Sequence, residues 1–252
     1  MPKIISIINH KGGVGKTTVT ANLGASMARL GARVLIVDFD PQANLTDHFG
    51  LEEGHAGDVA DVILERRKPR SQTYEGDGYQ LDIIPGNLDL SLAEKEFAGR
   101  ISGFSKCKQL VQELDAQYDT VLIDCPPSLG FLTLNALNAS THVLVPAEAS
   151  KFSVKGLNTI QNLIEEVKIE SNPGLQLIGV VINNMRNLRV SKQISDYLQS
   201  EHLTLKTQVR NYKHYIESAA TGTTVFEHEE AQNAQKDYTE LAKEIQNEEI
   251  PA

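Results

Sequence analysis

Hydrophobic runs of strand length alternate with segments of helical periodicity along the whole chain. The first pair is the run KIISIIN, residues 3–9, followed by a segment from Lys16 to Leu30 with the spacing of an amphipathic helix. Gly31 is a typical helix stop. Because continuous apolar strands are buried on both faces, the alternation predicts an α/β fold of three layers, a mostly parallel sheet with helices on both faces.

The remaining elements are predicted in the same alternating order. Strands are expected near 33–40, 79–87, 118–128, 141–148, 175–184 and 205–211, and helices near 56–67, 89–97, 104–116, 130–139, 153–170 and 190–201, with a last acidic helix at the C-terminus. The segment RRKPRSQTYEGDG, residues 66–78, is expected to be a surface excursion. With 252 residues, no internal repeat and no linker composition, we expect one domain spanning 1–252.

The composition also predicts the cellular compartment of the protein. The longest apolar runs, such as IISII and VLIV, are far too short to span a membrane, and the first residues have no export-signal pattern. The only cysteines are Cys107 and Cys125, which suits a reducing environment and predicts packed side chains rather than a disulfide. A cytoplasmic protein is therefore expected.

The segment NHKGGVGKTT, residues 9–18, predicts a phosphate-binding loop between the first strand and the first helix. Glycines let backbone N–H groups point at phosphate oxygens, and the helix N-terminus adds its positive end. Lys16 supplies a charge for the β- and γ-phosphates, and the Thr17 hydroxyl can bind Mg²⁺. The predicted nucleotide-binding residues of this loop are Gly12, Gly13, Val14, Gly15, Lys16, Thr17 and Thr18.

Carboxylates follow two of the predicted strands. VLIVDFDP places Asp38 and Asp40 at the end of one strand, and TVLIDCPPS places Asp124 at the end of another. Ligand sites of open α/β sheets gather at these strand ends, and an aspartate after an apolar strand supports the metal in phosphoryl-transfer enzymes. Together with the loop, these residues predict a site for ATP and Mg²⁺.

The motifs KGGVGKTT, VDFDPQAN and DCPPS resemble the deviant Walker A ATPases of the ParA/MinD family, which are P-loop NTPases. The resemblance extends over essentially the whole chain, including IESAATGTTVFE near the C-terminus. It implies an ATPase that forms an ATP-sandwich homodimer, in which Lys11 reaches the partner subunit's phosphates. A cation supplied by the partner stabilises charge on the transferring phosphoryl group only when two subunits meet.

The resemblance also implies roles for other residues. Lys11, Lys16 and Asp40 would be catalytic, with Asp40 orienting the attacking water. Thr17, Asp38 and Asp124 would be the metal-binding residues. Asn183 and Arg210 would lie where the family holds adenine.

Charge is distributed unevenly along the chain. The net charge is −9, yet residues 183–215 carry a local charge of +4 and residues 216–252 carry −7. A basic island in an acidic chain is a possible nucleic-acid footprint, and a solvated helix face is the alternative. The candidate DNA-binding residues are Arg186, Arg189, Lys192, Arg210 and Lys213, to which the cluster Arg66, Arg67, Lys68 and Arg70 could add.

Charge also separates branches of the family. MinD-like members end in a basic amphipathic helix that lies on membrane, whereas residues 236–252 contain five carboxylates and two lysines. The resemblance therefore implies a ParA-like, nucleoid-associated protein without a membrane partner. It would bind nonspecific double-stranded DNA and position a plasmid, a chromosome origin or a protein body such as a carboxysome through a ParB-like cargo adaptor. The alternatives are a metabolic or metal-cluster-assembly ATPase on the same scaffold and a MinD-like membrane-associated ATPase.

Overall fold

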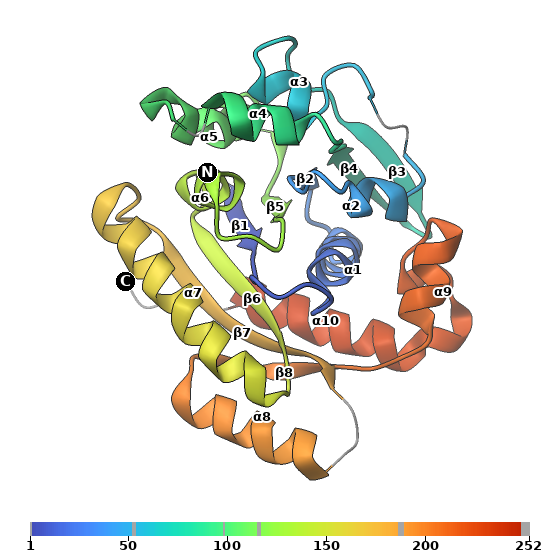
Figure 1. Cartoon of the computed structure of the whole chain (residues 1–252). Coiled ribbons are helices and arrows are strands. Elements are labelled where there is room, and N and C mark those ends of the chain that lie inside the picture. The colour runs from blue at the N-terminus through green and yellow to red at the C-terminus, as the bar shows by residue number, and fades with distance from the viewer. Residues whose placement is uncertain (1, 52–53, 98, 115–116, 186–188, 248–252) are drawn as a thin grey trace.

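A computed structural model describes residues 2–51, 54–97, 99–114, 117–185 and 189–247 of the chain. Its centre is an eight-stranded sheet with the order β3-β4-β2-β5-β1-β6-β7-β8 (Figure 1). All neighbouring strands are parallel except β3 and β4, which pair antiparallel. The predicted α/β class with a mostly parallel sheet is confirmed.

The strands follow the apolar runs. They are β1 (Lys3–Ile7), β2 (Val34–Asp38), β3 (Gln72–Gly76), β4 (Tyr79–Ile84), β5 (Thr120–Asp124), β6 (His142–Glu148), β7 (Gln176–Met185) and β8 (Thr204–Arg210). The central strands β2 and β5 are buried along their whole length, because helices cover them on both sides.

Helices form a layer on each face of the sheet (Figure 1). One layer contains α1 (Lys16–Arg29), α2 (Asn44–His48), α9 (His214–Thr221) and α10 (Gln232–Asn247). The opposite layer contains α3 (Val59–Ile63), α4 (Leu90–Phe97), α5 (Lys106–Gln112), α6 (Phe131–Ala139), α7 (Lys151–Glu170) and α8 (Arg189–Glu201), with the short 3₁₀ helix η1 (Ile101–Ser105) before α5.

Each layer packs on its own hydrophobic core because successive strand residues face opposite sides. In β5, Val121 and Ile123 face the α3–α8 layer, whereas Leu122 faces α1 and α10. Both cysteines are fully buried in the first of these cores, as predicted. Among the described residues, no helix is long and apolar enough to cross a membrane.

One strand and two α-helices were not predicted from the sequence. Residues 72–76 are β3 rather than a surface excursion, because they pair with β4 and Tyr74 packs against Phe49 and Tyr79. The helices α2 and α9 are only five and eight residues long.

The edge strand β8 is held by carboxylates of α10. Glu244 accepts hydrogen bonds from the backbone N–H groups of Lys206, at 2.7 Å, and Thr207, at 2.9 Å. Asp237 accepts one from the N–H of Arg210, at 3.0 Å. The acidic helix therefore satisfies main-chain donors at the end of the sheet.

Candidate functional site

The segment 9–18 forms the connection from β1 to α1 at the carboxyl edge of the sheet. Gly15 is the residue before α1 and has a φ of 86°, a left-handed conformation that favours glycine. A Cβ at this position would also collide with the side-chain amide of Asn183. The loop therefore needs glycine at residue 15 for both backbone conformation and space.

Lys16 is the first residue of α1 and is almost fully buried, with 8% of its surface exposed. Within the described part of the chain its ammonium has no hydrogen-bond or ion-pair partner. The charge of Lys16 acts on the neighbouring Asp124 carboxyl and lowers its pKa, although burial raises that pKa overall. The position of Lys16 at a helix N-terminus makes a phosphate the fitting anion.

Asp124 lies beneath the start of α1. The Thr17 hydroxyl donates to one of its carboxylate oxygens at 2.7 Å, and the Thr20 hydroxyl approaches the other at 3.2 Å. Burial, and next the charge of nearby Asp38, raise the pKa of Asp124 to about 7. A divalent cation at this point would favour the ionised carboxylate, so the residues fit Mg²⁺.

Asp38 is the register partner of Asp124 on the neighbouring strand. Burial raises the pKa of Asp38 to about 6, while hydrogen bonds from the Thr46 backbone N–H, at 2.9 Å, and hydroxyl, at 2.7 Å, oppose that shift. Thr46 thus fixes one carboxylate oxygen of the predicted metal-binding residue. The structure brings Asp38 and Asp124 together but gives Asp38 a protein partner of its own.

Asp40 follows β2 and is also buried, with 6% of its surface exposed. One carboxylate oxygen accepts a hydrogen bond from the Gln42 backbone N–H at 3.0 Å. This contact fixes the side chain at the same edge of the sheet as the loop, where a catalytic carboxylate was predicted.

Lys11 forms an ion pair that the sequence did not suggest. Its ammonium lies 2.6 Å from a carboxylate oxygen of Glu148, at the end of β6. The other oxygen of Glu148 accepts from the Asn184 amide at 2.9 Å. The backbone of Lys11 is fixed separately, because its N–H donates to the Asn9 side chain at 3.0 Å. In this single subunit, Lys11 is therefore held at its own loop.

The two residues predicted near adenine have protein partners. Asn183 donates through its side-chain amide to the Val14 carbonyl at 2.7 Å, so it supports the phosphate loop. The guanidinium of Arg210 bonds both oxygens of Asp237 and lies over the ring of Tyr212. The structure thus gives Arg210 an intramolecular role that competes with both the predicted adenine contact and the predicted DNA contact.

The basic island is only partly available as a surface. Arg189 and Lys192 lie on α8 and are exposed, with no ion-pair partner among the residues that the structure describes. Lys213 is exposed but pairs with Glu217 at 3.0 Å. Arg186 lies outside the described residues. In the second basic cluster, Arg66 and Arg67 form ion pairs with Asp89 and Asp61.

Sequence reasoning missed Thr46 and Glu148. Glu148 ends a predicted strand, and that position was a usable signal because functional side chains gather at the carboxyl ends of parallel strands. Thr46 lies in a short helix eight residues after the carboxylate it binds, and nothing in the local pattern indicates this contact.

Comparisons with known proteins identify relatives over most of the chain. A family model described as an AAA domain matches residues 2–177. The sporulation initiation inhibitor protein Soj of Bacillus subtilis is 33% identical over 261 residues, covering 97% of this chain and 98% of that protein. The chromosome-partitioning ATPase Soj of Treponema pallidum is 33% identical over 251 residues, covering 97% of each.

A solved structure agrees with the fold over nearly the same extent. Cobyrinic acid a,c-diamide synthase from Mycobacterium smegmatis, with a bound ATP analog and magnesium, has a TM-score of 0.82 and 29% identity, covering 96% of this chain and 93% of that one. Because the Soj relatives match along their full length and the loop and Asp124 lie together at the sheet edge, the chain belongs to the ParA/MinD family of deviant Walker A ATPases.

Proposed function

We propose that this ATPase dimerises around ATP and Mg²⁺, binds nonspecific double-stranded DNA in the cytoplasm and positions a cargo through an adaptor protein. The observation that carries the proposal is the position of Lys16 as the first residue of α1, beside the Thr17–Asp124 contact. It occurs in a chain that is 33% identical to a chromosome-partitioning ATPase over 97% of its length. An adaptor that stimulates hydrolysis would release the dimer locally.

Each residue of the site would have a separate role in phosphoryl transfer. Lys16 and the backbone of the loop hold the phosphates. Thr17 and Asp124 would hold Mg²⁺, with Asp38 beside them, and the ion would supply positive charge at the β- and γ-phosphates. Asp40 would orient the attacking water, because its buried carboxylate is fixed without occupying the Thr17–Asp124 contact.

Lys11 would complete the site of the partner subunit. In the free subunit its ammonium is paired with Glu148, so this pair has to open before Lys11 can reach another subunit's phosphates. Glu148 would therefore oppose dimerisation. The free energy of its ion pair with Lys11 determines how strongly it does so. The pair is partly exposed, at 40% and 25% of the two side chains, so we expect about 1 kcal/mol or less.

Replacing Glu148 by glutamine is expected to promote ATP-dependent dimerisation. Loss of the pair should lower the dimer dissociation constant by up to about 30-fold, because each dimer opens two pairs at about 1 kcal/mol each. Sedimentation velocity with a nonhydrolysable ATP analogue would measure it. Glu165→Gln, an exposed change on α7, is the matched control. An unchanged or weaker dimer in Glu148→Gln would show that this contact does not restrain Lys11.

The exposed cations of α8 are the proposed DNA contacts. Arg189→Glu together with Lys192→Glu should weaken binding to all DNA sequences alike and leave basal ATP hydrolysis unchanged. Each lost phosphate contact should flatten the salt dependence by about one unit of slope. Filter binding of unrelated duplexes over a salt series would measure both effects.

The control for this prediction is Lys95→Glu with Lys243→Glu. It changes the net charge equally at exposed positions on α4 and α10. If both double variants lose the same affinity, the effect is general charge and α8 is only a solvated face.

A second candidate function follows from the likeness to the diamide synthase, at 29% identity. On that reading the chain would be a metabolic ATPase that activates a small molecule. Salt-sensitive, ATP-dependent binding to arbitrary DNA supports the positioning function. ATP turnover that requires an added small-molecule acid, without DNA binding, supports the metabolic one. Co-sedimentation with anionic liposomes would instead support a membrane-associated ATPase.

A further inference from the structure

A cavity lies outside the phosphate loop, between η1–α5 and the C-terminal part of α7. Its volume is about 750 Å³. The phosphate loop meets α7 at Gly156, where His10 packs closely, and the first cavity residue on α7 is Leu163. Seven residues of helix separate these points by about 10 Å. The cavity is therefore distinct from the nucleotide site.

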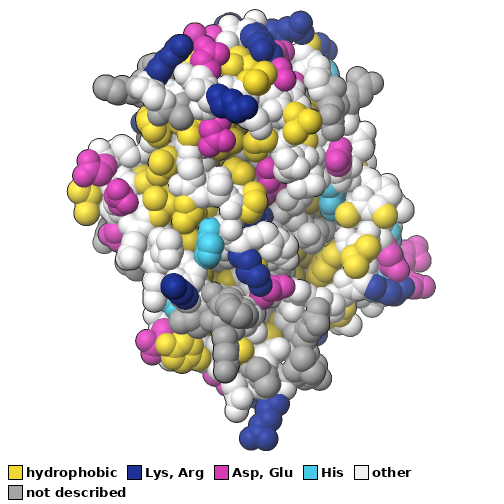
Figure 2. All heavy atoms as spheres, in the orientation of Figure 1, with side chains coloured by type: hydrophobic (Ala, Val, Ile, Leu, Met, Phe, Trp, Pro, Cys, Tyr) yellow, Lys and Arg dark blue, Asp and Glu magenta, His cyan; other side chains and the backbone are white. Residues whose placement is uncertain are grey.

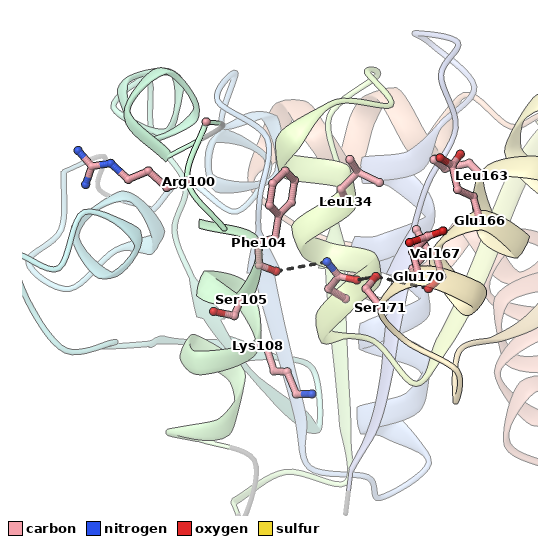
Figure 3. Close-up of a pocket in the computed structure, with 12 residues that line it drawn as sticks. Arg100, Phe104, Ser105, Lys108, Leu134, Leu163, Glu166, Val167, Glu170 and Ser171 are labelled. Atoms are coloured by element: carbon pink, nitrogen blue, oxygen red, sulfur yellow. Dashed lines mark hydrogen bonds between the residues drawn. The ribbon is translucent and has the colours of Figure 1, made fainter. Parts of the chain in front are cut away.

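The α7 wall of this groove is one helix face. Leu163, Glu166, Val167 and Glu170 have the spacing i, i+3, i+4, i+7, which brings them to the same side of the helix. Figure 3 shows Glu166 and Glu170 together on this side of the groove. Both carboxylates are exposed and have no ion-pair partner within the described residues.

The floor is apolar, and the opposite wall carries the cations Lys108 and Arg100. Phe104 and Leu134 lie between the two walls in Figure 3, and Lys108 lies opposite the two glutamates. The guanidinium of Arg100 points away from the groove, toward Glu96 at 3.7 Å. Figure 2 shows hydrophobic side chains at the surface between the α4–α5 layer and α7, with acidic side chains at the end of α7.

Polar groups inside the groove are already bonded to one another. The Asn138 amide donates to the Phe104 carbonyl at 3.3 Å, and the Ser171 hydroxyl donates to the Asn138 side chain at 2.5 Å (Figure 3). Small-molecule sites instead aim several polar groups at the ligand. An open apolar floor beside a row of carboxylates matches the helix-in-groove mode of peptide recognition.

From this arrangement we infer that the groove binds an amphipathic helix of a partner protein, whose apolar side enters the floor and whose basic flank faces Glu166 and Glu170. The inference does not depend on what the nucleotide site does. It specifies the partner by chemistry: leucine-like residues at i, i+3, i+4 and i+7, with lysine or arginine beside them.

The test uses the full chain and two helical peptides of about 16 residues, a length at which an isolated helix forms measurably. Both have the same leucines, and their polar positions are lysine in one and glutamate in the other. The lysine peptide should bind saturably in fluorescence anisotropy. Glu166→Lys with Glu170→Lys should lower the affinity for the lysine peptide about tenfold. The same variant should raise the affinity for the glutamate peptide, because two exposed charge pairs change sign.

Two further variants separate the groove from general effects. Glu113→Lys with Glu165→Lys changes the net charge equally outside the groove and should alter affinity less than about twofold. Leu163→Gln should weaken the binding of both peptides, because the α7 wall loses apolar contact. Thermal unfolding would confirm that each variant folds.

Three results would overturn the inference. They are no saturable binding of the lysine peptide, an equal response of the two charge variants, and a change in self-association of the groove variants. The last result would mean that a second copy of the chain occupies the groove.

Discussion

Lys16→Ala is expected to abolish measurable ATP binding. Lys16 is the first residue of α1, and Lys11, the other lysine of the loop, is paired with Glu148, so no other cation of the loop replaces the charge of Lys16 on the phosphates. Truncating one member of a buried charge pair costs about 2–5 kcal/mol, which lowers affinity by at least about 30-fold. Isothermal titration with Mg²⁺–ATP would measure the loss.

The fold should survive this substitution, because the ammonium of Lys16 holds no other described group in place. A thermal unfolding midpoint close to that of the parent protein would therefore accompany the loss of binding. Lys155→Ala removes an exposed lysine on α7 and should bind ATP normally. Near-normal affinity in Lys16→Ala would overturn the assignment of the loop.

Lys11→Ala and Asp40→Ala are each expected to bind ATP yet fail to hydrolyse it, for different reasons. Without Lys11 the site lacks the cation from the partner subunit, whereas without Asp40 the attacking water is misplaced. The Asp40→Ala dimer should form with ATP and persist, because the contacts of Lys16 and Thr17 remain.

An equal mixture of these two variants should recover activity. In a heterodimer, the Lys11→Ala chain keeps its own Asp40 and receives Lys11 from its partner, so one of the two sites is complete. Random exchange of subunits would give about one quarter of the parent rate. Phosphate release from each variant and from the mixture would measure it. If heterodimers form and the mixture stays inactive, Lys11 does not act across the dimer.

Elements that depend on local pattern were predictable from this sequence. The buried strands β2 and β5 are continuous apolar runs, and the phosphate loop carries its glycines, lysine and threonine within one segment. The carboxylate of Asp124 was placed correctly beside that loop, because the ends of parallel strands meet at one edge of the sheet.

Contacts between distant segments were not predictable. Lys11 and Glu148 are separated by 137 residues, and Asn183 lies 169 residues from the Val14 carbonyl that it binds. Such pairs depend on strand order and register, which periodicity alone does not determine. The strand β3 was missed for a similar reason: its polar residues become a strand only through pairing with β4.

The attachment of α10 to β8 also bears on aggregation. An outermost strand with unsatisfied donors is a template on which another chain can add a strand, the route to fibrous aggregates. Here the carboxylates of Glu244 and Asp237 occupy three of those donors. The acidic helix α10 therefore protects this edge of the sheet. A chain cut before residue 232 would lack α10, and β8 would be open to pairing with a strand of another chain.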